Sequence, residues 1–201
     1  GLKMESANYD LIKLKKHLKR RLDQNRFHHT IGVMYTAAAL AMAHGMDFVQ
    51  AETAGLLHDC AKCIPDTKKI QICERKNISI TCCERDHPDL LHSKLGAYLS
   101  KTDYGITDQD ILDAITWHTT GKPDMSELEK IIFIADYIEP SRDKAPNLTE
   151  IRQLAFSDLN ECMYQILKDT VHYLKGKSGS MDETTVDAYL YYSNYHNSRE
   201  E

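Results

Sequence analysis

The sequence contains few residues that interrupt helices, and no segment of the kind that enters a membrane. Nine Gly and five Pro in 201 residues leave room for long helices. No run approaches the roughly 18 to 20 apolar residues that span a bilayer. Residues 1–10 lack the apolar core of a secretory signal. We therefore expect neither a membrane partner nor export.

The sequence also lacks an excess of positive charge. Its 25 Lys and Arg residues stand against 30 Asp and Glu residues, which gives a formal net charge of −5. Proteins that coat nucleic acid or anionic membranes usually carry a basic surface. The charge balance therefore argues against a nucleic-acid partner. The proportions of hydrophobic residues (42%) and charged residues (27%) are typical of a soluble globular protein.

The six cysteines do not indicate a disulfide framework. The chain is long for such a framework and carries no export signal, so we expect reduced thiols and a cytoplasmic location. Cys60 and Cys63 have the spacing of half a zinc or redox site, but the sequence has no second pair of this kind.

Apolar residues recur at spacings of three and four along nearly the whole chain, and this is the pattern of amphipathic helices. No run alternates as a strand does, and no repeat or linker divides the chain. The sequence predicts an all-α, single-domain bundle over residues 1–201, with its core at about 8–195. We expect helices over 8–24, 28–44, 47–63, 66–76, 88–103, 107–118, 126–138, 149–174 and 182–195, an irregular segment over 77–87, N-caps at Asp47 and Asp182, and a capping box formed by Ser126 and Glu129.

A His-Asp pair follows two apolar residues in the predicted helix 47–63. A neutral imidazole and a carboxylate suit a divalent ion such as iron, manganese, cobalt or zinc. On a continuous helix, His58 and Lys62 share a face and Asp59 lies to one side. Lys62 could then hold a phosphate beside the metal. A single His-Asp pair is weak support, because such pairs are common on helix surfaces.

Four further polar residues lie within apolar helical segments. One of them is a carboxylate, and burial of a carboxylate without a partner costs free energy. Each alone is explained as a core residue or a helix cap, but together with the His-Asp pair they favour one site. They are His29, His92, His118 and Asp136.

The order His, His-Asp, His, His, Asp resembles the HD-domain metal-dependent phosphohydrolase superfamily. Within it, the motifs look like those of the bacterial YqeK family, described as symmetrical diadenosine tetraphosphate hydrolases. The resemblance spans about residues 8–195. The motifs that carry it are Arg26-Phe27-x-His29-Thr30, Ala54-Gly55-Leu56-Leu57-His58-Asp59-x-Ala61-Lys62, Leu90-Leu91-His92, His118-Thr119-Thr120-Gly121 and Ile134-Ala135-Asp136-Tyr137-Ile138-Glu139-Pro140-x-Arg142.

This resemblance implies an HD-type bundle and a centre of two divalent ions, with iron favoured and manganese, cobalt and zinc left open. A metal-activated water would cleave diadenosine tetraphosphate between its two central phosphates and release two ADP. Asp59, as the bridging ligand, and Lys62, at the phosphates, would carry the catalysis. The implied metal ligands are His29, His58, Asp59, His92, His118 and Asp136.

The nucleotide contacts follow from the same resemblance. We assign Arg26, Thr119 and Arg142 to the phosphates or sugar, because guanidinium groups match phosphate oxygens. Structural salt bridges are the alternative for the two arginines. Gly179 and Ser180 lie in a loop that could hold a nucleotide through backbone N–H groups, or could be a flexible surface loop.

Two other functions remain open at the level of the sequence. One is an HD-type nucleotidase or another phosphoester hydrolase, and the other is a metal-containing regulator that binds nucleotides with little catalysis. The expected partners are a dinucleotide substrate and a nucleoside diphosphate product. The aromatic C-terminal helix, with Tyr189, Tyr191, Tyr192 and Tyr195, offers a surface through which a homodimer could form.

Overall fold

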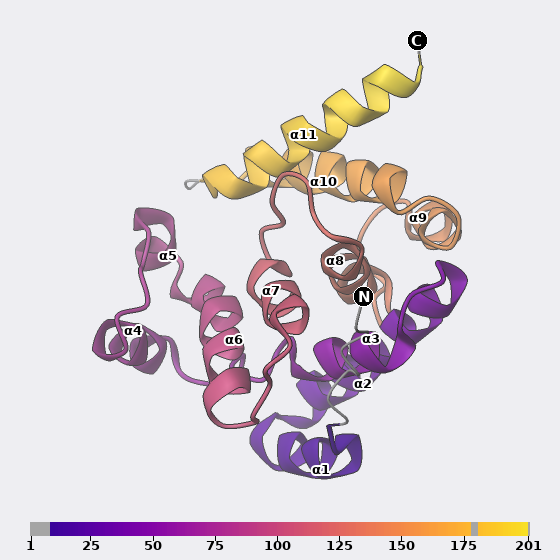
Figure 1. The fold of residues 1–201 in the computed structure, drawn as a ribbon. Helices are drawn as coiled ribbons and strands as arrows, with labels where there is room; N and C mark the ends of the chain where they lie inside the picture. Colours follow the sequence, from indigo (N-terminus) through magenta and orange to yellow (C-terminus); the bar gives the residue numbers. More distant parts are fainter. Residues whose placement is uncertain (1–8, 178–180, 201) are drawn as a thin grey trace, which may run out of the picture.

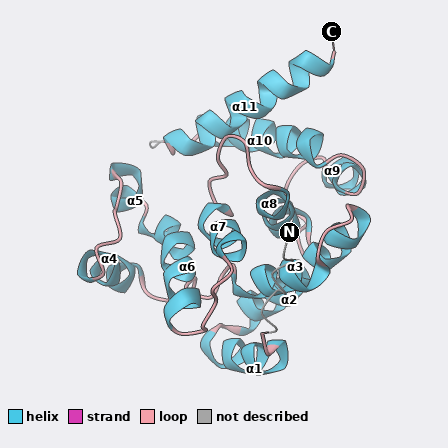
Figure 2. Ribbon diagram, in the orientation of Figure 1, coloured by secondary structure: helices cyan, strands magenta, loops and turns pink. Residues whose placement is uncertain are grey.

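The computed structural model describes residues 9–177 and 181–200, and within these ranges it contains helices and loops without strands (Figures 1 and 2). The all-α prediction is therefore confirmed. The helices are α1 (Leu11–Arg21), α2 (Gln24–Ala43), α3 (Phe48–Leu57), α4 (Asp66–Arg75), α5 (Cys82–Asp86), the 3₁₀ helix η1 (Pro88–Leu91), α6 (His92–Thr102), α7 (Gln109–Trp117), α8 (Glu127–Ile138), α9 (Leu148–Ala155), α10 (Leu159–Lys175) and α11 (Glu183–Arg199).

Side-chain caps begin most of these helices. The predicted N-caps are present: Asp47 accepts from the N–H of Val49, and Asp182 accepts from the N–H of Thr184. Ser126 and Glu129 form the predicted capping box. Each cap satisfies a backbone N–H that has no partner within the helix.

The predicted helix over 47–63 ends earlier than the apolar pattern indicates. Helix α3 stops at Leu57, and the following residues to Cys63 form turns. The His-Asp pair therefore lies in a turn after the helix. The side-chain directions expected for a continuous helix do not apply to it.

Two other predicted segments differ from the structure. The segment 77–87 contains α5, which begins with a second capping box, formed by Thr81 and Glu84. The single helix expected over 149–174 is divided into α9 and α10, and Asp158 caps the second of them. The chain turns at residues 156–158 because the Asp158 side chain accepts from the N–H of Glu161 and starts a new helix.

The main core lies between α2, α3, α7 and α8, with α10 and α11 covering one end (Figure 1). Helices α2 and α3 approach closely at Gly55, where a Cβ would lie 3.0 Å from the Cα of Met34. A smaller cluster around Cys73, Leu91 and Leu95 joins α4 and η1 to α6. In the described part of the chain, each helix is too short or too polar to cross a bilayer.

Candidate metal centre

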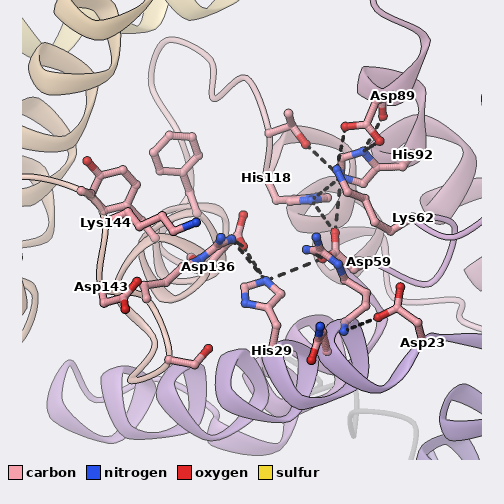
Figure 3. A pocket seen from close by; sticks show the side chains of 18 of the residues that line it. Asp23, His29, Asp59, Lys62, Asp89, His92, His118, Asp136, Asp143 and Lys144 are labelled. Atoms are coloured by element: carbon pink, nitrogen blue, oxygen red, sulfur yellow. Dashed lines mark hydrogen bonds and ion pairs between the residues drawn. The ribbon is translucent and has the colours of Figure 1, made fainter.

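A cavity of about 1040 Å³ lies where α2, the turn after α3, η1, α6, α7 and α8 meet. Figure 3 shows its polar side chains converging on Asp59 and Asp136. The structure brings all six predicted metal ligands to this region, although they are spread over 108 positions of the sequence. His29 lies on α2, His58 and Asp59 follow α3, His92 begins α6, His118 follows α7, and Asp136 lies in the last turn of α8.

Three of the histidines are oriented in the same way. Each donates its Nδ1–H to the carbonyl three residues earlier, so the Nε2 of a neutral ring carries the lone pair. In each case the Nε2 faces the centre of the cluster. The pairs are His58 with Gly55 (2.6 Å), His92 with Asp89 (2.5 Å) and His118 with Ile115 (2.7 Å).

The Asp59 carboxylate lies between two groups of donors. Its Oδ2 is 3.2 Å from the Nε2 of His58 and 3.6 Å from the Nε2 of His29. Its Oδ1 is 3.3 Å from the Nε2 atoms of both His92 and His118. Asp136 belongs to the first group, because its Oδ1 is 2.9 Å from the Nε2 of His29. The two oxygens of Asp59 thus face different sets of ligands.

The donor atoms need a cation between them. The Nε2 of His58 is buried and makes no hydrogen bond of acceptable geometry with any described residue. The Nε2 atoms of His92 and His118 are 3.1 Å apart, and two lone pairs at this distance require a proton or a metal ion. Because imidazole nitrogens and carboxylate oxygens suit borderline divalent metals, these residues fit a metal centre.

Opposite charges at the centre shift the pKa values of Asp59, Asp136 and His58. Burial raises the pKa of Asp59, but the charge of His58 and the nearby Nε2 atoms of His118, His58 and His92 hold it well below its ordinary value. Burial also raises the pKa of Asp136, but its hydrogen bond with His29 and the nearby His58 ring hold that pKa well below its ordinary value. Burial lowers the pKa of His58, but the Asp59 and Asp136 carboxylates raise it to about 10.

The predicted phosphate contacts line the same cavity, and each cation pairs with a carboxylate. Arg26 Nη1 is 3.0 Å from Oδ2 of Asp59, and Arg142 Nη2 is 3.1 Å from Oδ1 of Asp136. Lys62 and Thr119 also line the cavity. Lys62 Nζ donates to Asp89 Oδ2 at 2.6 Å, and the Oγ1 of Thr119 is 2.5 Å from the Oγ of Ser93.

Glu139 is not among the site residues predicted from the sequence. This buried carboxylate accepts from His29 Nδ1 at 2.5 Å. It also accepts from the backbone N–H of Ser141 at 2.5 Å and from the Ser141 hydroxyl at 2.6 Å. Gly32 leaves space for it, because a Cβ there would lie 3.0 Å from Oε1. A carboxylate behind a histidine fixes the ring and increases the basicity of its other nitrogen.

The sequence also singles out two loop residues, an aromatic C-terminal helix and a pair of cysteines. Gly179 and Ser180 are outside the described residues. The Tyr192 hydroxyl accepts from the N–H of Met125, and this ring is buried in the core. Cys60 is buried against Gly96, away from the cavity lining, so the spacing of Cys60 and Cys63 does not contribute to the centre.

Comparison with known proteins gives consistent results. The sequence matches the HD domain family over residues 26–141. It is 43% identical to the symmetrical bis(5′-nucleosyl)-tetraphosphatase of Bacillus subtilis (strain 168) over 161 residues, which are 80% of this chain and 86% of the relative. A protein of the same name from Staphylococcus aureus is 36% identical over 192 residues, which are 94% of this chain and 97% of the relative.

A solved structure shares the whole arrangement of helices. It is the crystal structure of a Clostridium acetobutylicum protein described as a predicted HD superfamily hydrolase involved in NAD metabolism. The TM-score is 0.89 at 38% sequence identity, and the match covers 93% of this chain and 98% of that one. The fold is therefore that of HD hydrolases.

Proposed function

Because the chain belongs to the HD domain family and to its YqeK branch, we propose that it hydrolyses diadenosine tetraphosphate symmetrically and releases two ADP. It is a metal-dependent phosphoanhydride hydrolase. The observation that carries this function is that the two carboxylate oxygens of Asp59 face two separate groups of metal-binding side chains, and that these groups line an open cavity. Such a division supports a centre of two ions, the arrangement that assists in-line displacement at phosphorus.

We propose that the first ion is held by His29, His58 and Asp136, the second by His92 and His118, and that Asp59 bridges them. When bound, two divalent ions neutralise charge on the phosphoryl oxygens and lower the pKa of an attacking water. Iron is our proposal for the metal, and the imidazole-rich donor set also accepts manganese, cobalt or zinc.

The cations of the cavity are suited to the phosphates. Arg26 and Arg142 form ion pairs with Asp59 and Asp136, the two carboxylates of the centre. Both guanidinium groups therefore lie next to the proposed reaction site. Once these carboxylates serve as ligands, the guanidinium groups can donate to phosphate oxygens. Lys62 would add a further positive contact. Together with two bound divalent ions, these cations would give the centre a local positive charge, and a chain of net charge −5 could then bind a polyanion.

The position of the centre within the cavity supports cleavage at the middle of the substrate. Figure 3 shows Asp143 and Lys144 on one side of Asp136, and Lys62 and Asp89 beyond Asp59 on the other. The cavity therefore continues in both directions from the donor set. A dinucleotide can extend a nucleoside to each side, which leaves its central anhydride at the centre.

Product analysis tests the proposed function. Metal-loaded protein given diadenosine tetraphosphate should form ADP as its only nucleotide product, and Asp59→Asn should abolish turnover. Formation of AMP and ATP in equal amounts would refute symmetrical cleavage. Faster hydrolysis of mononucleotides or other phosphoesters would favour the nucleotidase alternative, and tight binding without turnover would favour a regulator.

We also propose, from the same observations, one domain over residues 1–201 in the cytoplasm, with no nucleic-acid partner. The main core contains residues from α1 to α11, which supports a single domain. A homodimer through α11 is supported by the exposed side chains of Leu190 and Tyr191. The proposed nucleotide contacts of Gly179 and Ser180 rest on the sequence alone.

A further inference from the structure

A chain of four alternating charges runs from the cavity into the smaller hydrophobic cluster. Lys62 Nζ donates to Asp89 Oδ2 at 2.6 Å, and Lys69 Nζ is 3.3 Å from Asp89 Oδ1. Lys69 also donates to Asp66 Oδ1 at 3.0 Å. Asp89 is thus the member that contacts both lysines, one through each carboxylate oxygen.

The two lysines have different surroundings. Lys69 is 1% exposed, and a buried ammonium group needs anionic partners. Lys62 is partly exposed and lines the cavity together with Asp89. The side chain of Asp89 is 50% exposed, so a substrate can reach this pair. Lys69 therefore anchors the carboxylate from the protein side, while Lys62 meets it from the cavity side.

The backbone of Asp89 contacts His92, one of the proposed metal ligands. Its carbonyl accepts the Nδ1–H of His92 at 2.5 Å, which turns the His92 Nε2 toward Asp59. One residue of η1 therefore fixes both a proposed metal ligand and a proposed phosphate contact. This arrangement sets the position of the Lys62 ammonium group relative to the centre.

We propose that Asp89 is a positioning residue, which holds the Lys62 ammonium group at the cavity wall for contact with substrate phosphates, with Lys69 as its buried counter-charge. The inference rests on the proposed function, because it assigns Lys62 to a polyphosphate. A lysine side chain has four rotatable bonds and loses considerable rotamer entropy when it is fixed. The ion pair with Asp89 removes this cost before the substrate binds.

The test uses inorganic tripolyphosphate as a binding probe, so that it does not depend on turnover. Calorimetry on metal-loaded protein should show that Asp89→Asn weakens binding about tenfold, the loss expected for one ordered charged contact. In the Lys62→Met background, the same substitution should change the dissociation constant less than about twofold, because the two residues act as a unit. Glu74→Gln, which removes an exposed ion pair with Arg85 outside the cavity, is the control and should leave tripolyphosphate binding nearly unchanged.

Kinetics with diadenosine tetraphosphate provide the second measurement. Asp89→Asn should raise KM by the same factor with a smaller change in kcat, and metal content should stay at the wild-type value. Tighter tripolyphosphate binding by Asp89→Asn would show that Asp89 competes with phosphate for Lys62, and would overturn the proposal. Equal effects in both backgrounds, a similar loss in Glu74→Gln, or loss of metal would also overturn it. Absence of turnover in the wild type would refute the proposed function while leaving the binding comparison intact.

Discussion

At the scale of single residues, Glu139 orients the ring of His29 from behind the proposed metal centre. Each of its oxygens accepts a hydrogen bond: Oε2 from His29 and Oε1 from the backbone of Ser141. A glutamine can replace only one of these oxygens, and its NH₂ group would then face a donor. Glu139→Gln should therefore weaken metal binding by about 10- to 100-fold, as loss of such a partner typically does.

A chelator competition assay measures this effect, and the chain offers a matched control. Glu161 accepts from His196 Nδ1 at 2.7 Å, which is the same kind of pair outside the cavity. Glu161→Gln should leave metal affinity unchanged. Equal metal affinities for the two variants would contradict the role assigned to Glu139.

The charge state of His58 makes metal binding dependent on pH. In the metal-free protein the Asp59 and Asp136 carboxylates, acting against burial, raise the pKa of His58 to about 10, so near neutral pH this ring is protonated. A metal ion must displace that proton, and the apparent affinity therefore rises with pH by up to about tenfold per unit. Titrations with Mn²⁺ at pH 6.5, 7.5 and 8.5 should show this slope. A dissociation constant that does not change with pH would contradict it.

The role of Glu139 could not be predicted from the sequence, for a physical reason. Its partner His29 is 110 positions earlier, and no helical spacing links residues so far apart. The local pattern also gives no indication, because the glutamate follows an apolar helix and precedes a proline, as many helix ends do. Asp136 could be predicted, because it lies inside an apolar run of the sequence and a buried carboxylate there needs a cation as its partner.

At the scale of elements, α9 holds the end of α8 in place. Arg152 on α9 donates to the carbonyls of Ile138 (2.8 Å), Glu139 (3.1 Å) and Arg142 (2.7 Å). Carbonyls at a helix end lack partners within the helix, and a guanidinium group can satisfy several of them. The segment that contains Glu139 and Arg142 is thereby fixed beside the centre.

Arg152→Met should lower the free energy of unfolding by about 1 to 3 kcal/mol, the range for loss of hydrogen bonds to a charged group. It should also lower kcat/KM for diadenosine tetraphosphate, because Arg142 and Glu139 lose their support. Urea unfolding and steady-state kinetics measure the two effects. Arg199→Met removes an exposed ion pair with Asp158 and serves as the control. If the control lost as much stability and activity as Arg152→Met, the role of α9 would be refuted.

Two of the three differences from the predicted elements share one cause, which is a capping residue that starts a new helix inside a segment whose apolar spacing indicates something else. Thr81 and Glu84 form a capping box, and Asp158 caps the helix in which Glu161 is the third residue. Both signals are visible in the sequence. The early end of α3 is different, because the residues around His58 keep an apolar helical pattern and only tertiary contacts show the turn.

At the scale of the whole molecule, the proposed centre exists only when α2, α3, α6, α7 and α8 are packed together. Residue spacing could predict the helices and could mark individual polar residues within apolar runs. It could not show that those residues converge, which the resemblance to the HD superfamily supplied. The net charge of −5 was misleading in one respect, since it did not indicate a cavity lined by four Lys and Arg side chains.

We propose that the Asp59 carboxylate bridges two metal ions, and anomalous diffraction from crystals of the metal-loaded protein would locate them. Two peaks are expected in the cavity. One should lie among His29, His58 and Asp136, the other beside His92 and His118, with Asp59 between them. A single peak, or a second peak away from His92 and His118, would rule out the bridging role of Asp59.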